Sequence, residues 1–423
     1  MSGRTVYFPQ MSYAGARLIA AAFRAIGLDA TTAPNSNAET LELGGLYSSG
    51  EECLPHKITL GDFLRVCRQP GFDPRKTAFF MPRAPGPCRF GQYAPYLRQV
   101  LNEQGLADVA IVSPSSRDGY GALGDHASEL MRLVWMAIVA SDLATRWLLK
   151  TRPYEQHAGD TDEAFEAAIA SFADVIARRK PPAGQKVRLL AHTVAQIRDR
   201  FRAVPACYVK GRPLIGLVGE IFCRLNTFSN DDTARRIERL GGECWLSDIA
   251  EWVWYTHWSR ETDCLRTQGR FNTALLKLKL KSHIQHRYEQ ILIAPARKDF
   301  VGYEEPEGIR EILRAAEPYL PPAGALGEMT LSVGKAVYLY DKGADGILDI
   351  SPFTCMNGIV SEAVYPAVSA DHDDLPIRSL YFDKVNTHLD RDLEIFLDLA
   401  RAYQRRKRRP RVYPKYFESV KCA

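Results

Sequence analysis

Three of the nine cysteines stand where the chain is expected to turn, and turns are where thiolate metal sites form. Gly or Pro lies close on both sides of Cys53, Cys88 and Cys355, so we expect each to sit on a tight turn at the end of a helix or strand. Such a turn exposes the sulfur together with neighbouring backbone N–H groups, which is what a metal–thiolate site needs. The other six lie in apolar, helical or turn-poor surroundings and are predicted to be small buried hydrophobes: Cys67, Cys207, Cys223, Cys244, Cys264 and Cys422.

The spacing of these three cysteines bears on the kind of metal they would hold. Cys88 follows Cys53 by 35 residues and Cys355 follows Cys88 by 267, and no two cysteines form a C-x₂-C pair. Three thiolates suit an iron–sulfur cube with one iron left open, or a tetrahedral zinc with an open fourth position. Zinc sites usually take closely paired ligands, so the long spacings favour a cluster between domains. Spacing alone also leaves open three buried cysteines that hold no metal.

Charged residues beside these cysteines are candidates for chemistry. Arg89, His56 and Lys57 are expected to raise the potential of a cluster or to protonate a substrate bound to it. Glu52 and Glu220 are candidate acids, or partners in hydrogen bonds between domains. For Arg89, His56 and Lys57, the alternative is an ordinary solvent-facing or helix-capping side chain.

Apolar runs that alternate with helical patterns must position these residues. Strands are expected at 6–8, 77–81, 109–112, 214–218, 243–246, 346–350 and 378–382. Helices are expected at 14–27, 53–68, 93–104, 232–240, from 248, over most of 273–317, and at 328–340 and 390–406. Continuous apolar strands separated by helices are typical of parallel sheets covered on both faces. We therefore expect an α/β protein with two or more Rossmann-like parallel-sheet lobes and a helical insert.

The same pattern predicts four segments. Residues 1–124 form an N-terminal α/β lobe with two of the cysteines, and residues 125–205 form the helical insert. Residues 206–400 form a second α/β lobe with the third cysteine, and residues 401–423 form a basic C-terminal tail. Ligands of parallel sheets bind at the carboxyl ends of the strands, so a cluster is expected in the cleft between the two lobes.

Composition and charge exclude several classes of protein. At 423 residues, 46% hydrophobic and 25% charged, the chain is neither disordered, collagen-like nor a small disulfide scaffold. The net charge of +5 divides into −3 for residues 1–400 and +8 for residues 401–423, so the excess positive charge lies at the C-terminal end. We therefore expect no nucleic-acid partner for the body of the protein. The run 405–409 either ends a helix in solvent or binds RNA, an acidic partner or a phosphate-bearing cofactor. No apolar stretch is long enough to span a membrane and no signal peptide is visible, so we expect a cytoplasmic protein.

Five stretches of the sequence resemble one family. They are Gly50-Glu-Glu-Cys-Leu-Pro-His-Lys-Ile-Thr-Leu-Gly61, Gly86-Pro-Cys-Arg-Phe-Gly-Gln-Tyr93, Val218-Gly-Glu-Ile-Phe-Cys-Arg224, Asn226-Thr-Phe-Ser-Asn230, and Gly343-Ala-Asp-Gly346 leading to Pro352-Phe-Thr-Cys-Met-Asn-Gly-Ile-Val-Ser361. Together they resemble proteins related to the 2-hydroxyacyl-CoA dehydratase D-component, and above all the branch described as CoA-enzyme-activase-related. The resemblance extends over residues 5–400.

The resemblance implies a cofactor, a partner and an activity. The cofactor is a [4Fe–4S] cluster, or half of a double-cubane [8Fe–9S] cluster, held by Cys53, Cys88 and Cys355. Electrons would come from a separate ATP-hydrolysing activator, for a reductive or radical dehydration, and a homodimer or a heterodimer with a related subunit is compatible with this. No ATP-binding loop is present in this chain. Asn357 stands where the resemblance predicts Pro, in Cys-Met-Pro-Gly, which puts the rigidity of that turn in doubt.

Two other functions stay open at this stage. The chain would be a non-catalytic electron-relay or scaffold subunit if its cluster only passed electrons onward. It would be a zinc-binding protein of the same fold if the three thiolates held zinc instead of iron. The sequence does not identify a substrate, nor whether the substrate is a CoA thioester.

Overall fold

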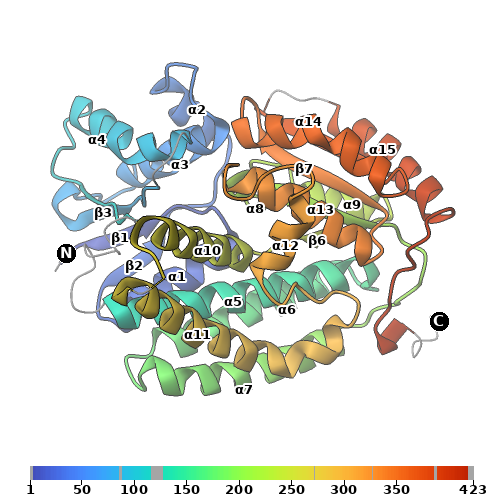
Figure 1. The fold of residues 1–423 in the computed structure, drawn as a ribbon. Coiled ribbons are helices and arrows are strands. Elements are labelled where there is room, and N and C mark those ends of the chain that lie inside the picture. The colour runs from blue at the N-terminus through green and yellow to red at the C-terminus, as the bar shows by residue number, and fades with distance from the viewer. Residues whose placement is uncertain are drawn as a thin grey trace.

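The computed structural model describes residues 3–84, 88–115, 127–270, 272–325, 327–384 and 388–417. Residues 85–87 of the predicted Cys88 turn therefore lie outside the described part. The same holds for residues 125 and 126 of the predicted helical insert and for residues 418–423 of the predicted tail, which include Cys422. Two four-stranded, all-parallel sheets with helices packed against them make up the body of the chain (Figure 1). The expected pair of Rossmann-like lobes is confirmed.

The first lobe contains a sheet with the strand order β2-β1-β3-β4. Its strands are β1 (Thr5–Phe8), β2 (Asp29–Thr32), β3 (Thr77–Phe80) and β4 (Ala110–Val112), and its helices are α1 (Tyr13–Ala25), α2 (Ala38–Leu46), α3 (Leu54–Cys67) and α4 (Tyr93–Glu103). The short 3₁₀ helices η1 (Pro74–Lys76) and η2 (Arg89–Gln92) precede β3 and α4. Helices α2 and α3 pack closely because Gly61 of α3 has no side chain: a Cβ there would lie 1.8 Å from the Thr40 carbonyl oxygen. This contact fixes the segment that leads into Cys53.

The second lobe contains a sheet with the strand order β6-β5-β7-β8. Its strands are β5 (Leu214–Gly219), β6 (Glu243–Leu246), β7 (Gly346–Pro352) and β8 (Ile377–Phe382). Its helices are α8 (Ile221–Leu225), α9 (Thr233–Arg239), α12 (Ile309–Ala316), α13 (Glu328–Asp341), α14 (Met356–Asp371) and α15 (Leu389–Gln404). Every residue of β5 and β7 is buried, as expected for central strands covered on both faces, whereas the edge strand β8 is half-buried.

Long helices connect the two lobes. They are α5 (Ala127–Thr151), α6 (Asp160–Ala177), α7 (Ala183–Ala203), α10 (Ile249–Gln268) and α11 (Thr273–Ile293), with the 3₁₀ turns η4 (Arg152–Tyr154) and η5 (Ala294–Phe300). Helix α5 contacts α1 of the first lobe and β6 of the second, and the buried Asp142 of α5 accepts hydrogen bonds from the backbone of Ile249 and Ala250 at the start of α10. One hydrophobic core therefore contains side chains from both lobes. Among the described residues, none of the helices combines the length and the apolar character that crossing a membrane requires.

The basic run after α15 is largely neutralised by the chain itself. Lys407 pairs with Asp345 at 2.7 Å, Arg408 with Asp373 at 3.4 Å and Arg409 with Asp341 at 3.6 Å. Beyond the run, the buried Arg411 pairs with the buried Glu243 at 2.6 Å, and η6 (Lys415–Phe417) follows. The described part of the tail therefore lies against the second lobe.

Candidate functional site

Each of the three candidate cysteines lies immediately before the first turn of a helix. Cys53 precedes α3, Cys88 precedes η2 and then α4, and Cys355 precedes α14. Cys88 and Cys355 also follow the carboxyl ends of β3 and β7, the edge at which parallel sheets bind ligands. Backbone N–H groups at the start of a helix carry partial positive charge, so these positions favour thiolates.

Arg89 brings the three cysteine loops together. Its Nη1 donates to the carbonyl oxygen of Glu51, two residues before Cys53, and to Oγ1 of Thr354 at 3.3 Å, directly before Cys355. Arg89 itself follows Cys88. One guanidinium group therefore contacts two of the loops from within the third, across 265 residues of sequence. The sequence predicted Arg89 as a charge that tunes a cluster; its role as a bridge between loops depends on the fold.

Two opposing effects act on the ionisation of the three thiols: burial disfavours the thiolate, and hydrogen-bond donors favour it. Burial raises the pKa of Cys53, whereas the Tyr93 hydroxyl, 2.8 Å from its Sγ, and the backbone N–H of His56 lower it. Cys88 is exposed on one side, yet partial burial raises its pKa to about 11, and burial raises the pKa of Cys355 to about 12. Backbone N–H groups again oppose these two shifts, as hydrogen-bond donors to the sulfurs. A bound metal cation overrides burial and deprotonates a coordinating thiol.

A fourth cysteine, Cys223, belongs to the same region. It is fully buried in α8, and its pKa is raised well above the ordinary value by burial and then by the negative charges of Glu220, Cys355 and Cys53. Cys223 lies in one of the five stretches that carry the resemblance, but its apolar neighbours led to the prediction of a buried structural cysteine. Among the described residues, no set of three His, Cys, Asp or Glu side chains is gathered as a single metal ion would require.

Two buried carboxyl groups lie beside the cysteines. Glu220 accepts from the backbone N–H groups of Phe222 at 3.0 Å and Cys223 at 2.7 Å, and its negative charge raises the pKa of all three candidate cysteines. Glu328 opens α13, accepts from the Ile221 N–H at 2.9 Å, and has its pKa raised to about 8 by burial and by Glu220. Glu328 therefore keeps its proton at neutral pH. It was not predicted, because a Glu at the start of a helix is ordinary in sequence.

Asn357, the residue that departs from the expected motif, contacts this carboxyl group. Its Nδ2 lies 3.3 Å from Oε2 of Glu328, and its Oδ1 is buried without a hydrogen-bond partner. A proline at this position would not make this contact, because it has no side-chain amide. The departure therefore adds an amide group to the site and fixes the orientation of Glu328.

The remaining candidates have other surroundings. His56 is buried and stacks on Tyr93 with 4.6 Å between the ring centres, and burial lowers its pKa to about 4, so the ring is neutral. Glu52 accepts from Ser49 Oγ at 2.9 Å within its own turn; although burial opposes ionisation, this and backbone hydrogen bonds lower its pKa. Lys57 is half-buried on α3. These contacts give Glu52 a local structural role.

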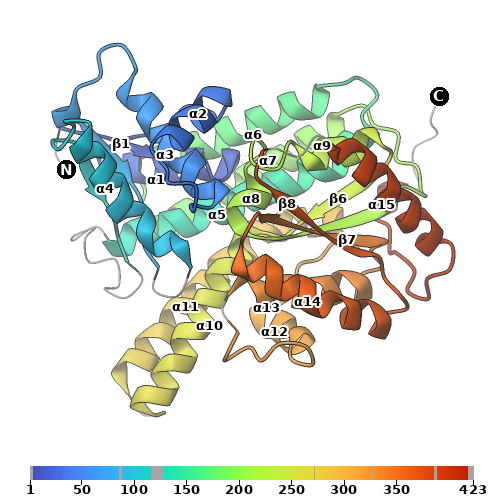
Figure 2. The same cartoon turned by 90° about the horizontal axis from the view of Figure 1, so that it is seen from above.

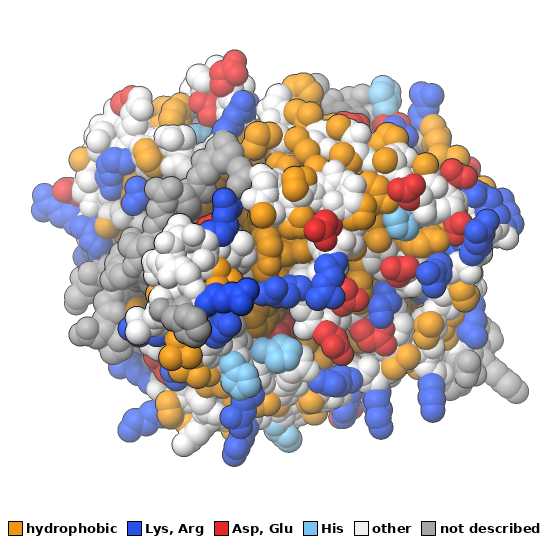
Figure 3. All heavy atoms as spheres, in the orientation of Figure 1, with side chains coloured by type: hydrophobic (Ala, Val, Ile, Leu, Met, Phe, Trp, Pro, Cys, Tyr) orange, Lys and Arg blue, Asp and Glu red, His pale blue; other side chains and the backbone are white. Residues whose placement is uncertain are grey.

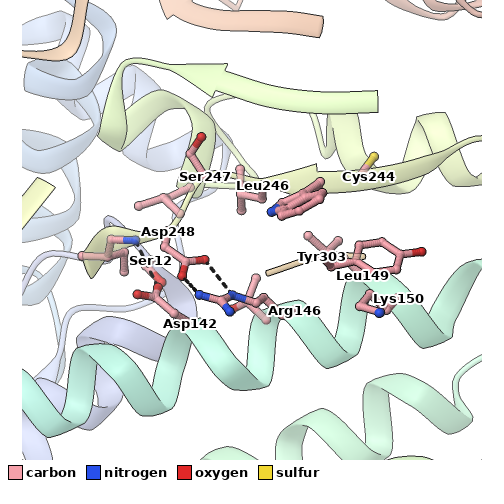
Figure 4. A pocket seen from close by; sticks show the side chains of 14 residues that line it. Ser12, Asp142, Arg146, Leu149, Lys150, Cys244, Leu246, Ser247, Asp248 and Tyr303 are labelled. Atoms are coloured by element: carbon pink, nitrogen blue, oxygen red, sulfur yellow. Dashed lines mark hydrogen bonds and ion pairs between the residues drawn. The ribbon is translucent and has the colours of Figure 1, made fainter. Parts of the chain in front are cut away.

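A small pocket lies between α5 and the carboxyl end of β6 (Figure 4). Its volume of about 20 Å³ has room for one or two water molecules. Arg146 and Asp248 pair across it, and Lys150 lies at its other end with Nζ 3.3 Å from the centre of the Tyr303 ring. Arg146 and Asp248 are engaged with each other and Lys150 with Asp299 and Tyr303, so the charged groups of this pocket already have partners within the protein.

Comparison with known proteins adds no relative. No protein-family model matches the chain, and no curated protein matches it.

The protonated state of Glu328 predicts how stability depends on pH in the metal-free protein. The folded state holds this proton up to about pH 8, whereas the unfolded state releases it near the ordinary value of 4.5. The folded state therefore binds more protons between these values and loses stability as the pH rises through this range. We expect Glu328→Gln to remove this loss, by on the order of 1 kcal/mol per pH unit. Urea unfolding at several pH values measures it.

Glu394→Gln is the matched control, since Glu394 is exposed on α15 and has no ion pair among the described residues. Its profile should follow that of the wild type. Parallel profiles for Glu328→Gln and the wild type would show that Glu328 is ionised in the folded protein.

Proposed function

We propose that this chain is an iron–sulfur protein of the 2-hydroxyacyl-CoA dehydratase type. It accepts low-potential electrons from an ATP-hydrolysing activator and uses them in a reductive or radical dehydration. The observation that supports this most directly is the bridge made by Arg89, because it ties together the loops of Cys53, Cys88 and Cys355. Thiol groups before helix N-termini are the kind of donor that iron–sulfur clusters use, so the residue types fit the group, although among the described residues they are not gathered as a single metal ion would require.

Cys53, Cys88 and Cys355 would hold the cluster, which supplies one-electron chemistry at low potential and an open iron for a substrate oxygen. The backbone N–H groups that face the three sulfurs stabilise their negative charge and adjust the potential. Tyr93 donates its hydroxyl proton to Sγ of Cys53 when that thiol is ionised. The protein thus supplies three anionic ligands together with hydrogen-bond donors for them.

Glu328 supplies the proton that a dehydration requires. A hydroxyl group departs from carbon as water when it takes up a proton, and Glu328 holds one at neutral pH on a carboxyl oxygen. Glu220 keeps that proton in place because two adjacent carboxylates resist being ionised together. Asn357 orients the acid through its amide.

The electron-relay function is the second candidate, and the exposure of Cys88 favours it. A relay needs a ligand close to the surface, where electrons enter and leave, but no acid next to the cluster. Replacing Glu328 by Gln separates the two: a dehydratase would lose turnover, whereas a relay would keep its rate of electron transfer.

Anaerobic purification with an absorption spectrum and a count of iron and sulfide tests the proposal. About four irons per chain with equal sulfide supports a single cube, and about eight supports the double-cubane assembly. Stoichiometric zinc in a colourless protein would contradict the proposal in favour of the zinc-binding alternative.

A further inference from the structure

A helical arm projects from the body of the molecule. Its described residues are 255–270 and 272–287, the outer parts of α10 and α11 (Figure 2). Its inner end is anchored, since Trp135 of α5 donates to the Gln285 carbonyl at 2.9 Å and Trp254 donates to Glu289 at 3.1 Å. Beyond these contacts the two helices extend away from both sheets.

The arm is strongly basic on a body that is not. Residues 255–287 contain seven Lys and Arg against two acidic residues, whereas residues 1–400 together carry −3. Six of the seven cations form no ion pair with any described residue: Arg266, Arg270, Lys277, Lys279, Lys281 and Arg287. Within the arm, burial and then the charges of Lys281 and Arg260 lower the pKa of His257 to about 4. The positive charge of these six side chains is therefore available to a binding partner outside the chain.

Exposed leucines lie between these cations. Leu276 is 70% exposed and Leu280 is 60% exposed, and a spacing of four places them on one face of α11 beside Lys277 and Lys279. Large apolar side chains in water on a helix that also carries unpaired charge indicate a protein-binding face. A nucleic-acid backbone would satisfy the lysines but leave both leucines in water.

The arm stands beside the candidate site. At its base, the Tyr255 hydroxyl accepts from the N–H of Gly327, directly before Glu328, at 2.8 Å. Helix α14, which Cys355 precedes, lies on the same side of the molecule as the arm (Figure 2). Phe353, shortly before this helix, is 60% exposed, and Met356 and Ile359 in its first turns are 42% and 52% exposed. Figure 3 shows apolar side chains gathered on this face, with Lys and Arg side chains crossing it below.

These observations define one face with an apolar patch, a basic arm and the candidate cysteines. Two copies that met through this face would bring two arms of like charge together, which opposes a symmetric pair. We propose that the arm docks an acidic electron-transfer protein, holding it against the apolar patch next to Cys355. The inference rests on the proposed function, because such a partner is the electron donor which that function requires.

Binding of a plant-type acidic [2Fe–2S] ferredoxin to the purified full chain tests the docking face. We expect binding at about 20 mM salt that weakens strongly at about 300 mM, where charges are screened. Lys277→Glu combined with Lys279→Glu should weaken binding at low salt by about tenfold or more. Leu276→Ser combined with Leu280→Ser should weaken it at both salt concentrations, because apolar contact is not screened. Titration calorimetry measures each affinity.

The matched control is Arg391→Glu combined with Arg405→Glu, which changes the charge equally on and just after α15, away from the arm. Its affinity should stay within about twofold of the wild type. No binding by the wild type, or equal weakening by the two charge-reversed variants, would overturn the docking face. The iron count on the same samples is independent: ferredoxin binding without iron refutes the proposed function alone, and iron without arm-dependent binding refutes the arm alone.

Discussion

Cys88→Ala is expected to abolish iron binding when the protein is purified anaerobically. Cys88 is one of three thiols whose loops meet at Arg89, and the neighbouring 3₁₀ helix offers no substitute sulfur. A cube held by two thiolates has two irons without a protein ligand and is lost to solvent. Iron and sulfide counts and the visible absorption should both fall to background. The far-ultraviolet circular dichroism should stay unchanged, since Cys88 contributes little to the core.

Cys67→Ala is the control for this prediction. Cys67 ends the same α3 helix that Cys53 precedes, and a rise of about 1.5 Å per residue places it about 20 Å away along the helix axis. Iron content should therefore equal that of the wild type. Equal iron losses in the Cys67 and Cys88 variants would mean that the ligands have been assigned wrongly.

Lys335→Met is expected to destabilise the protein by about 3–5 kcal/mol. Lys335 is fully buried in α13, the helix that Glu328 opens, and its ammonium group lies between Glu251, at 3.3 Å, and Glu305. Although burial opposes its charge, these two carboxylates raise the pKa of Lys335. Methionine would remove the cation that pairs directly with both carboxylates. The midpoint of urea unfolding measures the loss.

Lys342→Met tests whether burial is the cause. Lys342 pairs with Glu304 at 3.1 Å just after the same helix, but its side chain is 30% exposed and that of Glu304 49%. Such a pair contributes at most about 1 kcal/mol. Adding Glu251→Gln and Glu305→Gln to Lys335→Met should restore part of the stability. A loss as large for Lys342→Met as for Lys335→Met would contradict the explanation.

The two sheets could be predicted because their strands carry unbroken apolar runs. Leu214–Gly219 and Gly346–Pro352 are buried along their whole length, and such runs lie in parallel sheets covered on both faces. The turns at the three cysteines were predictable for a similar reason, since Gly and Pro mark the ends of elements. Each of these patterns involves only neighbouring residues, so it can be recognised in the sequence without knowledge of the fold.

What could not be predicted depends on contacts between distant segments. Arg89 contacts Thr354 only once both lobes have folded, and the sequence around either residue does not indicate that the two will be neighbours. The pKa of Glu328 is raised by burial and by the charge of Glu220, which lies 108 residues away and on another element. The arm was part of a stretch expected to be helical, but its exposure depends on how little of the body packs against it.

The core that α5 shares between the two lobes has a consequence for how the gene could be divided. Phe8 of β1, Trp135 of α5 and Ile347 of β7 belong to one continuous cluster of buried side chains. A fragment that ended between the lobes would expose that cluster to water and aggregate. Two complementing halves should therefore assemble only when both are expressed in the same cell. The two sheets are thus expected to fold and unfold as a single unit.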